Sequence, residues 1–162
     1  MIKLQASVCI EAPAELVWAH LTKLEDIPLW SEAVLHASCD GPISRGVGAE
    51  RTCQLAGNRP IREQWVAWDE GRAFAYEGHD IPMMKRAFNQ WSVVPYGDKS
   101  LLTSAAEVEI KGGLLGRILE PVFGPLMRRM APDALARFKD LVEQGEAFAG
   151  KGANLPRIPA RC

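Results

Sequence analysis

The segment from Leu114 to Phe148 constrains the fold of this chain more than any other. It reads LLGRILEPVFGPLMRRMAPDALARFKDLVEQGEAF, and its apolar residues recur at steps of three and four. That spacing predicts an amphipathic helix. Its predicted apolar face comprises Leu115, Ile118, Leu119, Val122, Leu126 and Met130, continued by Leu135, Phe138, Leu141 and Val142. An isolated helix cannot bury such a face, so we expect the preceding residues to wrap around it.

Prolines and basic residues shape this helix further. Each proline lacks an N–H and crowds the preceding turn, so kinks or short breaks are expected at Pro121, Pro125 and Pro132. The basic residues are expected on a solvated face, with contact to an acidic headgroup or a membrane as the alternative. The stripe expected to face solvent contains Arg117, Arg128 and Lys139, and the alternative concerns Arg117, Arg128 and Arg129.

Length, charge and cysteine spacing limit the class of protein. The 162 residues suit a single domain, expected over residues 1–149 with a loosely ordered tail over 150–162. A formal net charge of -1 provides no general positive field for nucleic acid, and no apolar run approaches the ~20 residues that span a bilayer. The N-terminus lacks a signal-peptide pattern, and the cysteines at 9, 39, 53 and 162 lack metal-ligand spacing. These features predict a cytoplasmic protein without a metal or a cofactor, in which Cys39 and Cys53 are free thiols on neighbouring strands.

The residues before the long helix read as strands and turns. Ile2 to Glu11 alternate between apolar and polar residues, which predicts a half-buried strand with Leu4 and Val8 on its inner face. Pro13 fits the first turn of a short helix, and a second short helix or turn ends near Trp30. The stretch 33–110 consists of short alternating runs separated by turn residues, which indicates antiparallel hairpins.

The hairpin turns predict which side chains share a face. Pairing around Glu70-Gly71 sets Trp65 opposite Tyr76 and Ala67 opposite Phe74, and pairing around Gly57-Asn58 sets Thr52 opposite Glu63 on the same face. In the last hairpin, Trp91 and Val93 are predicted to share a face with residues of the following strand, which are Leu102, Ser104, Ala106 and Val108. A single β-bulge would change part of this map. The expected fold is α+β, with a curved antiparallel sheet wrapped around the long C-terminal helix and two short helices after the first strand.

Three stretches of the chain resemble a known superfamily. They are IEAPAELVWAHLTKLEDIPLWSEAV, REQWVAWDEGRAFAYE and WSVVPYGDKSLLTSAAEVEIKGGLLGRILEP. In this order they resemble the START-like (SRPBCC) superfamily, and within it the polyketide cyclase/dehydrase and lipid-transport family. The resemblance implies a helix-grip, Bet v 1-like fold with a deep apolar cavity between sheet and helix. It also implies binding of lipids, polyketides or other hydrophobic molecules, and some members act as aromatase/cyclases.

Glu63 is the leading candidate for chemistry. If it faces the cavity with Tyr76, it could bind a ligand hydroxyl or move a proton, with Tyr76 or Asn89 as a second polar group. The alternative is a structural ion pair with Arg51 or Arg62. The predicted ligand-binding set is Trp30, Thr52, Glu63, Trp65, Tyr76, Asn89, Trp91, Leu119, Phe123 and Met127. Its aromatic members could stack on a flat ligand or could simply fill a core.

Two functions follow from this candidate site. One is a carrier of a small hydrophobic molecule, and the other is a polyketide cyclase, aromatase or dehydratase. The predicted partner is a small hydrophobic molecule, without nucleic acid or an integral membrane segment, and homodimerisation is left open. The histidines at 20, 36 and 79 form no triad or metal-ligand spacing, although His79 precedes a loop, Pro82-Met83-Met84, that could rim a pocket mouth.

Overall fold

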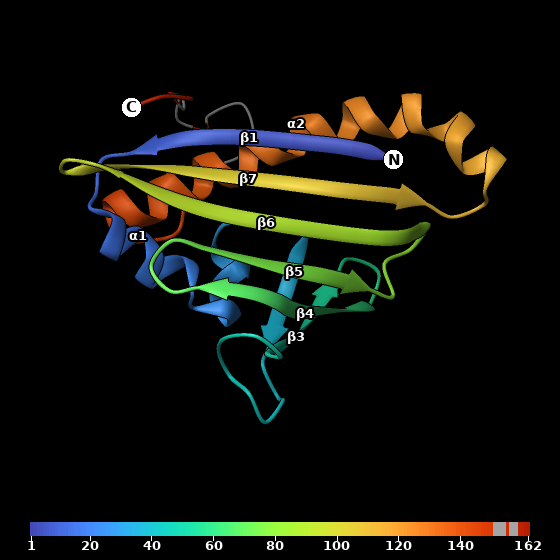
Figure 1. Ribbon diagram of the computed structural model, residues 1–162, viewed down its shortest axis with the longest axis horizontal. Coiled ribbons are helices and arrows are strands. Elements are labelled where there is room, and N and C mark those ends of the chain that lie inside the picture. Colours follow the sequence, from blue (N-terminus) through green and yellow to red (C-terminus); the bar gives the residue numbers. More distant parts are fainter. Residues whose placement is uncertain (151–154, 156–158) are drawn as a thin grey trace.

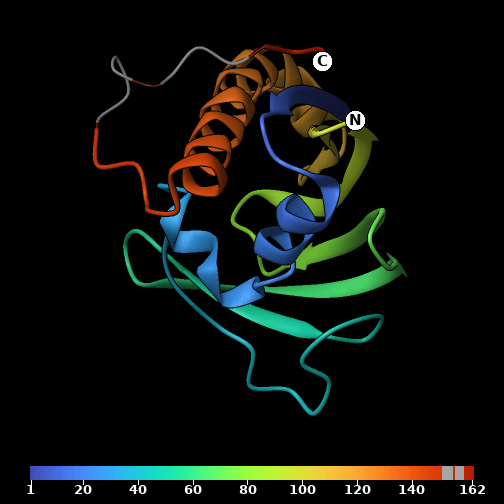
Figure 2. The same ribbon diagram turned by 90° about the vertical axis from the view of Figure 1, so that its left-hand side faces the viewer.

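The structure is a computed structural model that describes residues 1–150, 155 and 159–162. Its strands form one antiparallel sheet with the order β1-β7-β6-β5-β4-β3-β2. The strands are β1 (Ile2–Ile10), β2 (Val34–Ser38), β3 (Glu50–Leu55), β4 (Arg59–Asp69), β5 (Ala73–His79), β6 (Met84–Tyr96) and β7 (Lys99–Ile110). The helices are α1 (Ala14–Leu21), the 3-10 helix η1 (Leu24–Leu29) and α2 (Leu114–Gln144). The sheet curves around α2, and α1 and η1 pack at one end, which confirms the predicted helix-grip fold (Figures 1 and 2).

The predicted inner face of β1, β6 and β7 is confirmed. Val8 pairs with Leu102, which in turn pairs with Val93, and all three side chains are buried. Because side chains on a strand alternate with a period of two, one correct pair sets the orientation of a whole regular strand. The inner face therefore includes Trp91 and Asn89, two and four residues before Val93.

The predicted pairing of Thr52 with Glu63 is wrong by one residue. Leu55 pairs with Arg59, so the loop between β3 and β4 contains three residues rather than two, and Arg51 pairs with Glu63. Thr52 consequently lies on the outer face and is exposed. A shift of one residue in register reverses which face a side chain occupies.

A β-bulge changes the next hairpin after its first correct pair. Trp65 pairs with Tyr76 as predicted, but the register shifts at Val66, so that Phe74 pairs with Trp68 rather than Ala67. The bulge turns Trp68 inward, where its ring stacks on Phe74 with a centroid distance of 5.4 Å. The inward positions beyond the bulge thus differ from those that strict alternation predicts.

The long helix α2 is continuous from Leu114 to Gln144, and the predicted breaks at the prolines do not occur. It ends at Gly145, whose φ of 79° is the left-handed conformation that glycine adopts at low cost. No helix among the described residues is long and apolar enough to cross a membrane.

The predicted apolar face of α2 is confirmed only in the C-terminal half. There it is buried in the core, through Leu135, Phe138, Leu141 and Val142. In the N-terminal half the prediction is wrong, because the residues expected to be buried are exposed: Leu115, Ile118, Leu119, Val122, Leu126 and Met130. Phe123 and Met127 contact the sheet instead. Apolar residues occupy more than half of the helix circumference here, so periodicity alone does not identify the inner side.

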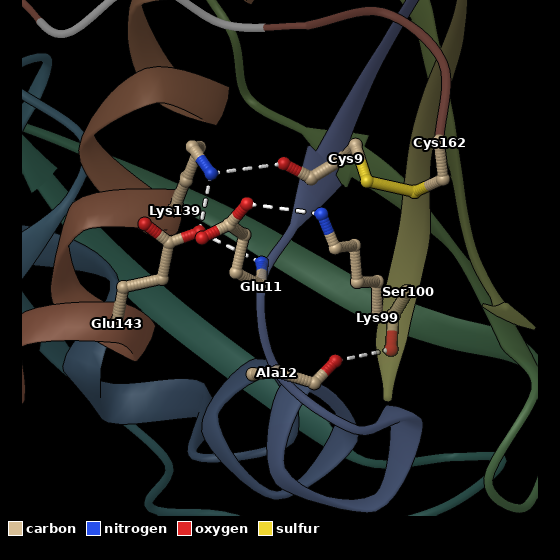
Figure 3. Close-up of polar contacts among 8 residues, drawn as sticks. All are labelled: Cys9, Glu11, Ala12, Lys99, Ser100, Lys139, Glu143 and Cys162. Carbon is tan, nitrogen blue, oxygen red and sulfur yellow. Dashed lines mark hydrogen bonds and ion pairs between the residues drawn. A yellow bond between two sulfur atoms is a disulfide. The ribbon is translucent and has the colours of Figure 1, made fainter. Parts of the chain in front are cut away.

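The C-terminus is fastened to β1. Cys9 and Cys162 form a disulfide (Figure 3). The Cys9 N–H also donates a hydrogen bond of 2.7 Å to the carbonyl of Pro159. Residues 159–162 of the predicted loose tail are thus tied to β1, whereas 151–154 and 156–158 lie outside the described residues. Cys39 and Cys53 are free cysteines, as predicted, and Cys53 on β3 pairs with Ala37, two residues before Cys39.

A buried lysine fastens α2 to the same end of β1. The Nζ of Lys139 donates a hydrogen bond of 3.0 Å to the Cys9 carbonyl and forms an ion pair with Glu143 (Figure 3). Glu143 in turn accepts a bond of 2.8 Å from the Glu11 N–H. The prediction of a solvated position for Lys139 is therefore wrong, because β1 covers this side of the helix.

Candidate functional site

The inner face of the sheet carries two separate apolar clusters. The larger one surrounds the C-terminal half of α2 and includes Trp91 and Phe138. The smaller one consists of Ile2, Val108 and Ile110, with Leu4, Met84, Phe123 and Met127 packed against it. Both clusters contact the same helix, and a strip of sheet that belongs to neither cluster lies between them.

The strip between the clusters consists of residues from β6 and β7. Asn89 pairs with Tyr76 on one side and with Ala106 on the other, and Ser104 pairs with Trp91. Asn89, Ser104 and Ala106 are only partly buried, whereas Tyr76 and Trp91 are buried. We call Asn89, Ser104 and Ala106 the inner strip. Its amide and hydroxyl provide hydrogen-bonding groups on an otherwise apolar surface.

The predicted aromatic residues form the wall beside the inner strip. The ring of Trp65 lies 4.9 Å from that of Tyr76, and Trp30 makes edge contacts with Trp91 at 5.5 Å and with Phe138 at 5.4 Å. All five rings are buried. Their mutual packing is that of a core, which was the simpler of the two predicted roles.

Glu63 forms the structural ion pair that was considered as the alternative to a catalytic role. Arg51 Nε and Nη2 donate hydrogen bonds of 2.8 and 2.5 Å to the same oxygen of Glu63, and Nη1 donates one of 2.7 Å to the Leu24 carbonyl. Both residues are buried, with 4% of Arg51 and 7% of Glu63 exposed. The guanidinium also lies 5.0 Å from the centre of the Trp65 ring and 5.7 Å from that of Tyr76.

The ionisable groups around this pair stay neutral. Burial raises the pKa of Cys53 to about 12, and the nearby Glu63 carboxylate acts in the same direction. Burial is also the main reason that the pKa of Tyr76 is raised, followed by repulsion from Glu63. The Cys53 thiol lies 3.4 Å from the Glu63 carboxylate as a weak donor. At neutral pH, Tyr76 can therefore donate a hydrogen bond but does not act as a base.

Trp65 provides an unused hydrogen-bond donor. Its Nε1 is buried and has no acceptor among the described residues. A buried donor without a partner costs about 1–3 kcal/mol, so an acceptor that reached it would be favoured.

Two small clefts lie where α2 meets the rest of the fold. One has a volume of ≈ 70 Å³ and is apolar, with a lining of Pro82, Met83, Met84, Val108, Ile110, Phe123 and Met127. The other has a volume of ≈ 90 Å³ and is lined by Trp30, Ser31, Glu32, Ala33, Met130, Asp133, Ala134 and Arg137. The first agrees with the expectation that the methionine loop could rim a pocket mouth.

The structure brings together most, but not all, of the predicted ligand-binding residues. Thr52 lies on the outer face, and Leu119 is 38% exposed. The other predicted residues face the interior or the clefts. Sequence reasoning missed Ser104 and Ala106 as site residues, although it had placed them on the correct face. Among the described residues, no group of histidine, cysteine or acidic side chains could hold a metal ion.

Comparison with known proteins agrees with the fold. A family model described as polyketide cyclase/dehydrase and lipid transport matches residues 1–143. A protein structure from Thermus thermophilus is 18% identical, with 88% of this chain and 98% of that one covered and a TM-score of 0.72. A START superfamily protein from Mycobacterium smegmatis is 17% identical, with coverage of 89% and 99% and a TM-score of 0.69.

A third similar structure is the Zhui aromatase/cyclase from Streptomyces sp. R1128. It is 16% identical, with 88% of this chain and 93% of that one covered and a TM-score of 0.69. No curated protein matches the chain. At these identities the structural similarities establish the shared fold and nothing finer.

Proposed function

The chain belongs to the polyketide cyclase/dehydrase and lipid transport family, and from this premise we propose that it binds a small hydrophobic molecule between the sheet and the first half of α2. The observation that carries the proposal is the inner strip. A fold that only needed a core would continue the apolar packing across this region. Here Asn89 and Ser104 stay partly buried between two apolar clusters. A few hydrogen-bonding groups within an apolar lining are typical of small-molecule sites.

Binding requires the first half of α2 to move away from the sheet. The two clefts along α2, at ≈ 70 and ≈ 90 Å³, are smaller than the roughly 300–1,000 Å³ of typical ligand pockets. The first half of α2 is held to the small apolar cluster by Phe123 and Met127. Pro121 and Pro125 each remove a helix hydrogen bond in the same stretch, which lowers the cost of bending there.

The expected ligand is apolar with one or two polar groups. Phe123 and Met127 supply an adaptable apolar wall, since methionine side chains adjust to varied shapes. Asn89 and Ser104 would orient a hydroxyl or carbonyl group of the ligand, and Trp65 Nε1 is a further donor for an acceptor that reached it. This chemistry fits lipids, polyketides or flat aromatic compounds.

The alternative, a cyclase, aromatase or dehydratase, rests on the similarity to the Zhui aromatase/cyclase and to norcoclaurine synthase from Thalictrum flavum. In this chain, Glu63 is already engaged in a buried ion pair with Arg51, which donates two hydrogen bonds to one of its oxygens. This favours the carrier. A cytoplasmic location belongs to the same proposal, and the redox state of Cys9 and Cys162 in cells tests it, because disulfides are rare in reducing compartments.

Native mass spectrometry of the purified protein tests the proposal, through co-purifying apolar molecules and a panel of added fatty acids and aromatic compounds. Ala106→Phe should fill the inner strip and reduce binding at least tenfold. The control is Ala105→Phe, because Ala105 pairs with Gln5 and Gln90 on the outer face of the same strand. Equal binding by both variants, or binding of no compound in the panel, would contradict the proposal.

A further inference from the structure

An apolar surface on α2 is exposed and is not covered by the described part of the chain. Five large apolar side chains on its first half face away from the sheet, and we call them the outer face: Leu114, Leu115, Ile118, Val122 and Leu126. Leu114 is 77% exposed, Ile118 is 69% exposed and Val122 is 68% exposed. Single exposed apolar residues are ordinary, but a row of them at helical spacing indicates a contact surface.

Basic residues surround the outer face. Residues 111–130 contain four basic residues and one acidic residue, although the whole chain has a formal net charge of -1. The acidic residue, Glu120, is already neutralised by an ion pair with the N-terminal ammonium of Met1. Lys111, Arg128 and Arg129 are exposed, and Arg129 lies seven residues after Val122, on the same side of the helix. The segment that carries the outer face therefore has a net positive charge.

The charge pattern distinguishes between two occupants. A symmetric dimer through the outer face would place the same patch on both copies, so that Arg128 and Arg129 of one copy would lie near the same arginines or near Lys111 of the other. Such like charges oppose association. An anionic lipid surface offers both an apolar layer for the leucines and negative headgroups for the arginines.

We propose that the outer face of α2 docks on the surface of an anionic lipid membrane. Leu114, Ile118 and Val122 enter the boundary between headgroups and acyl chains. Lys111 and Arg129 contact the headgroups, since long basic side chains extend toward the charged layer. Docking in this orientation leaves the inner side of α2, with Phe123 and Met127, directed toward the sheet.

Vesicle sedimentation tests the proposal with the full chain. The wild-type protein should bind vesicles of phosphatidylcholine mixed with phosphatidylglycerol, and should bind phosphatidylcholine alone at least tenfold more weakly. Ile118→Glu with Val122→Glu should reduce binding at least tenfold. Arg128→Gln with Arg129→Gln should reduce it by about fivefold for each arginine and flatten its dependence on salt.

Leu35→Glu is the matched control, because Leu35 is an exposed apolar residue on β2, at the opposite edge of the sheet from β1. It should leave vesicle binding unchanged, and urea unfolding should show that every variant is folded. Equal binding to neutral and anionic vesicles would overturn the proposal. So would a wild-type dimer in analytical ultracentrifugation that Ile118→Glu with Val122→Glu dissociates, because the outer face would then be covered by a second copy. The ligand-binding proposal would stand in either case.

Discussion

Glu63→Gln should destabilise the protein strongly, whatever its effect on function. The substitution removes the negative charge opposite Arg51, whose guanidinium is buried and stays charged. Removing one partner of a buried ion pair costs about 3–5 kcal/mol, because the remaining charge is left without compensation. The glutamine carbonyl can still accept one hydrogen bond, and the Leu24 carbonyl keeps its bond to Arg51. We therefore expect a loss near the lower limit, about 3 kcal/mol.

A double variant tests whether the loss of stability comes from the uncompensated charge of Arg51. Arg51→Met with Glu63→Leu replaces the pair by apolar side chains of similar length. Such replacements of buried ion pairs are often neutral or stabilising, although the Leu24 carbonyl would lose its donor here. We expect the double variant to lose less than about 2 kcal/mol, and therefore less than Glu63→Gln alone.

Urea unfolding followed by tryptophan fluorescence provides the assay, since Trp65 lies beside the pair. A loss below about 1 kcal/mol for Glu63→Gln, or strictly additive effects of the two substitutions in the double variant, would refute the reasoning. The result also bears on the cyclase alternative. Lost activity of Glu63→Gln has a catalytic meaning only when the variant is assayed well below its unfolding transition.

Three further predictions concern thiols, the disulfide and pH. Cys39 and Cys53 should react slowly with a thiol reagent at pH 8 and rapidly after denaturation, because burial raises the pKa of both; fast native labelling of both would contradict this. Under oxidising conditions, Cys162→Ser should have a free energy of unfolding about 2–4 kcal/mol below that of the wild-type protein. In the presence of a reductant, the variant and the wild-type protein should be equally stable. N–H donation from two tryptophan rings lowers the pKa of Glu70 below 4.5, so its stabilising contribution is present above that value and is lost as pH falls through the folded pKa. Glu70→Gln should reduce the acid-induced fall in melting temperature, and an unchanged pH profile would exclude this contribution.

The regular strands could be predicted from the sequence, whereas the irregular hairpins could not. Val8, Val93 and Leu102 were placed correctly because alternation continues unbroken along β1, β6 and β7. The position of Thr52 depended on whether the turn at Gly57-Asn58 has two or three residues, and the composition of the turn permits both. The bulge at Val66 could not be predicted from the neighbouring residues, because its effect on stability depends on how Trp68 packs against other strands.

The candidate site was predictable in its residues more than in its geometry. Glu63 was singled out and Arg51 was named as one of two possible partners, but the predicted register set Thr52, rather than Arg51, opposite Glu63. The side of α2 that faces the sheet was ambiguous because Val122 and Phe123 are both apolar neighbours on the helix. Cys9 and Cys162 are 153 residues apart, and nothing in local sequence indicates that they meet.

Heteronuclear NMR during titration with a flat aromatic probe, such as naphthalene, tests the central claim most directly. If the ligand binds between the inner strip and α2, the amide signals of Asn89 and Ser104 and the methyl signal of Met127 should shift together and saturate. The amide signals of Leu35 and Val66, on exposed parts of other strands, should not move. Saturable shifts confined to the outer face of α2, or no shift at Asn89, Ser104 and Met127 with any compound that binds, would contradict the claim.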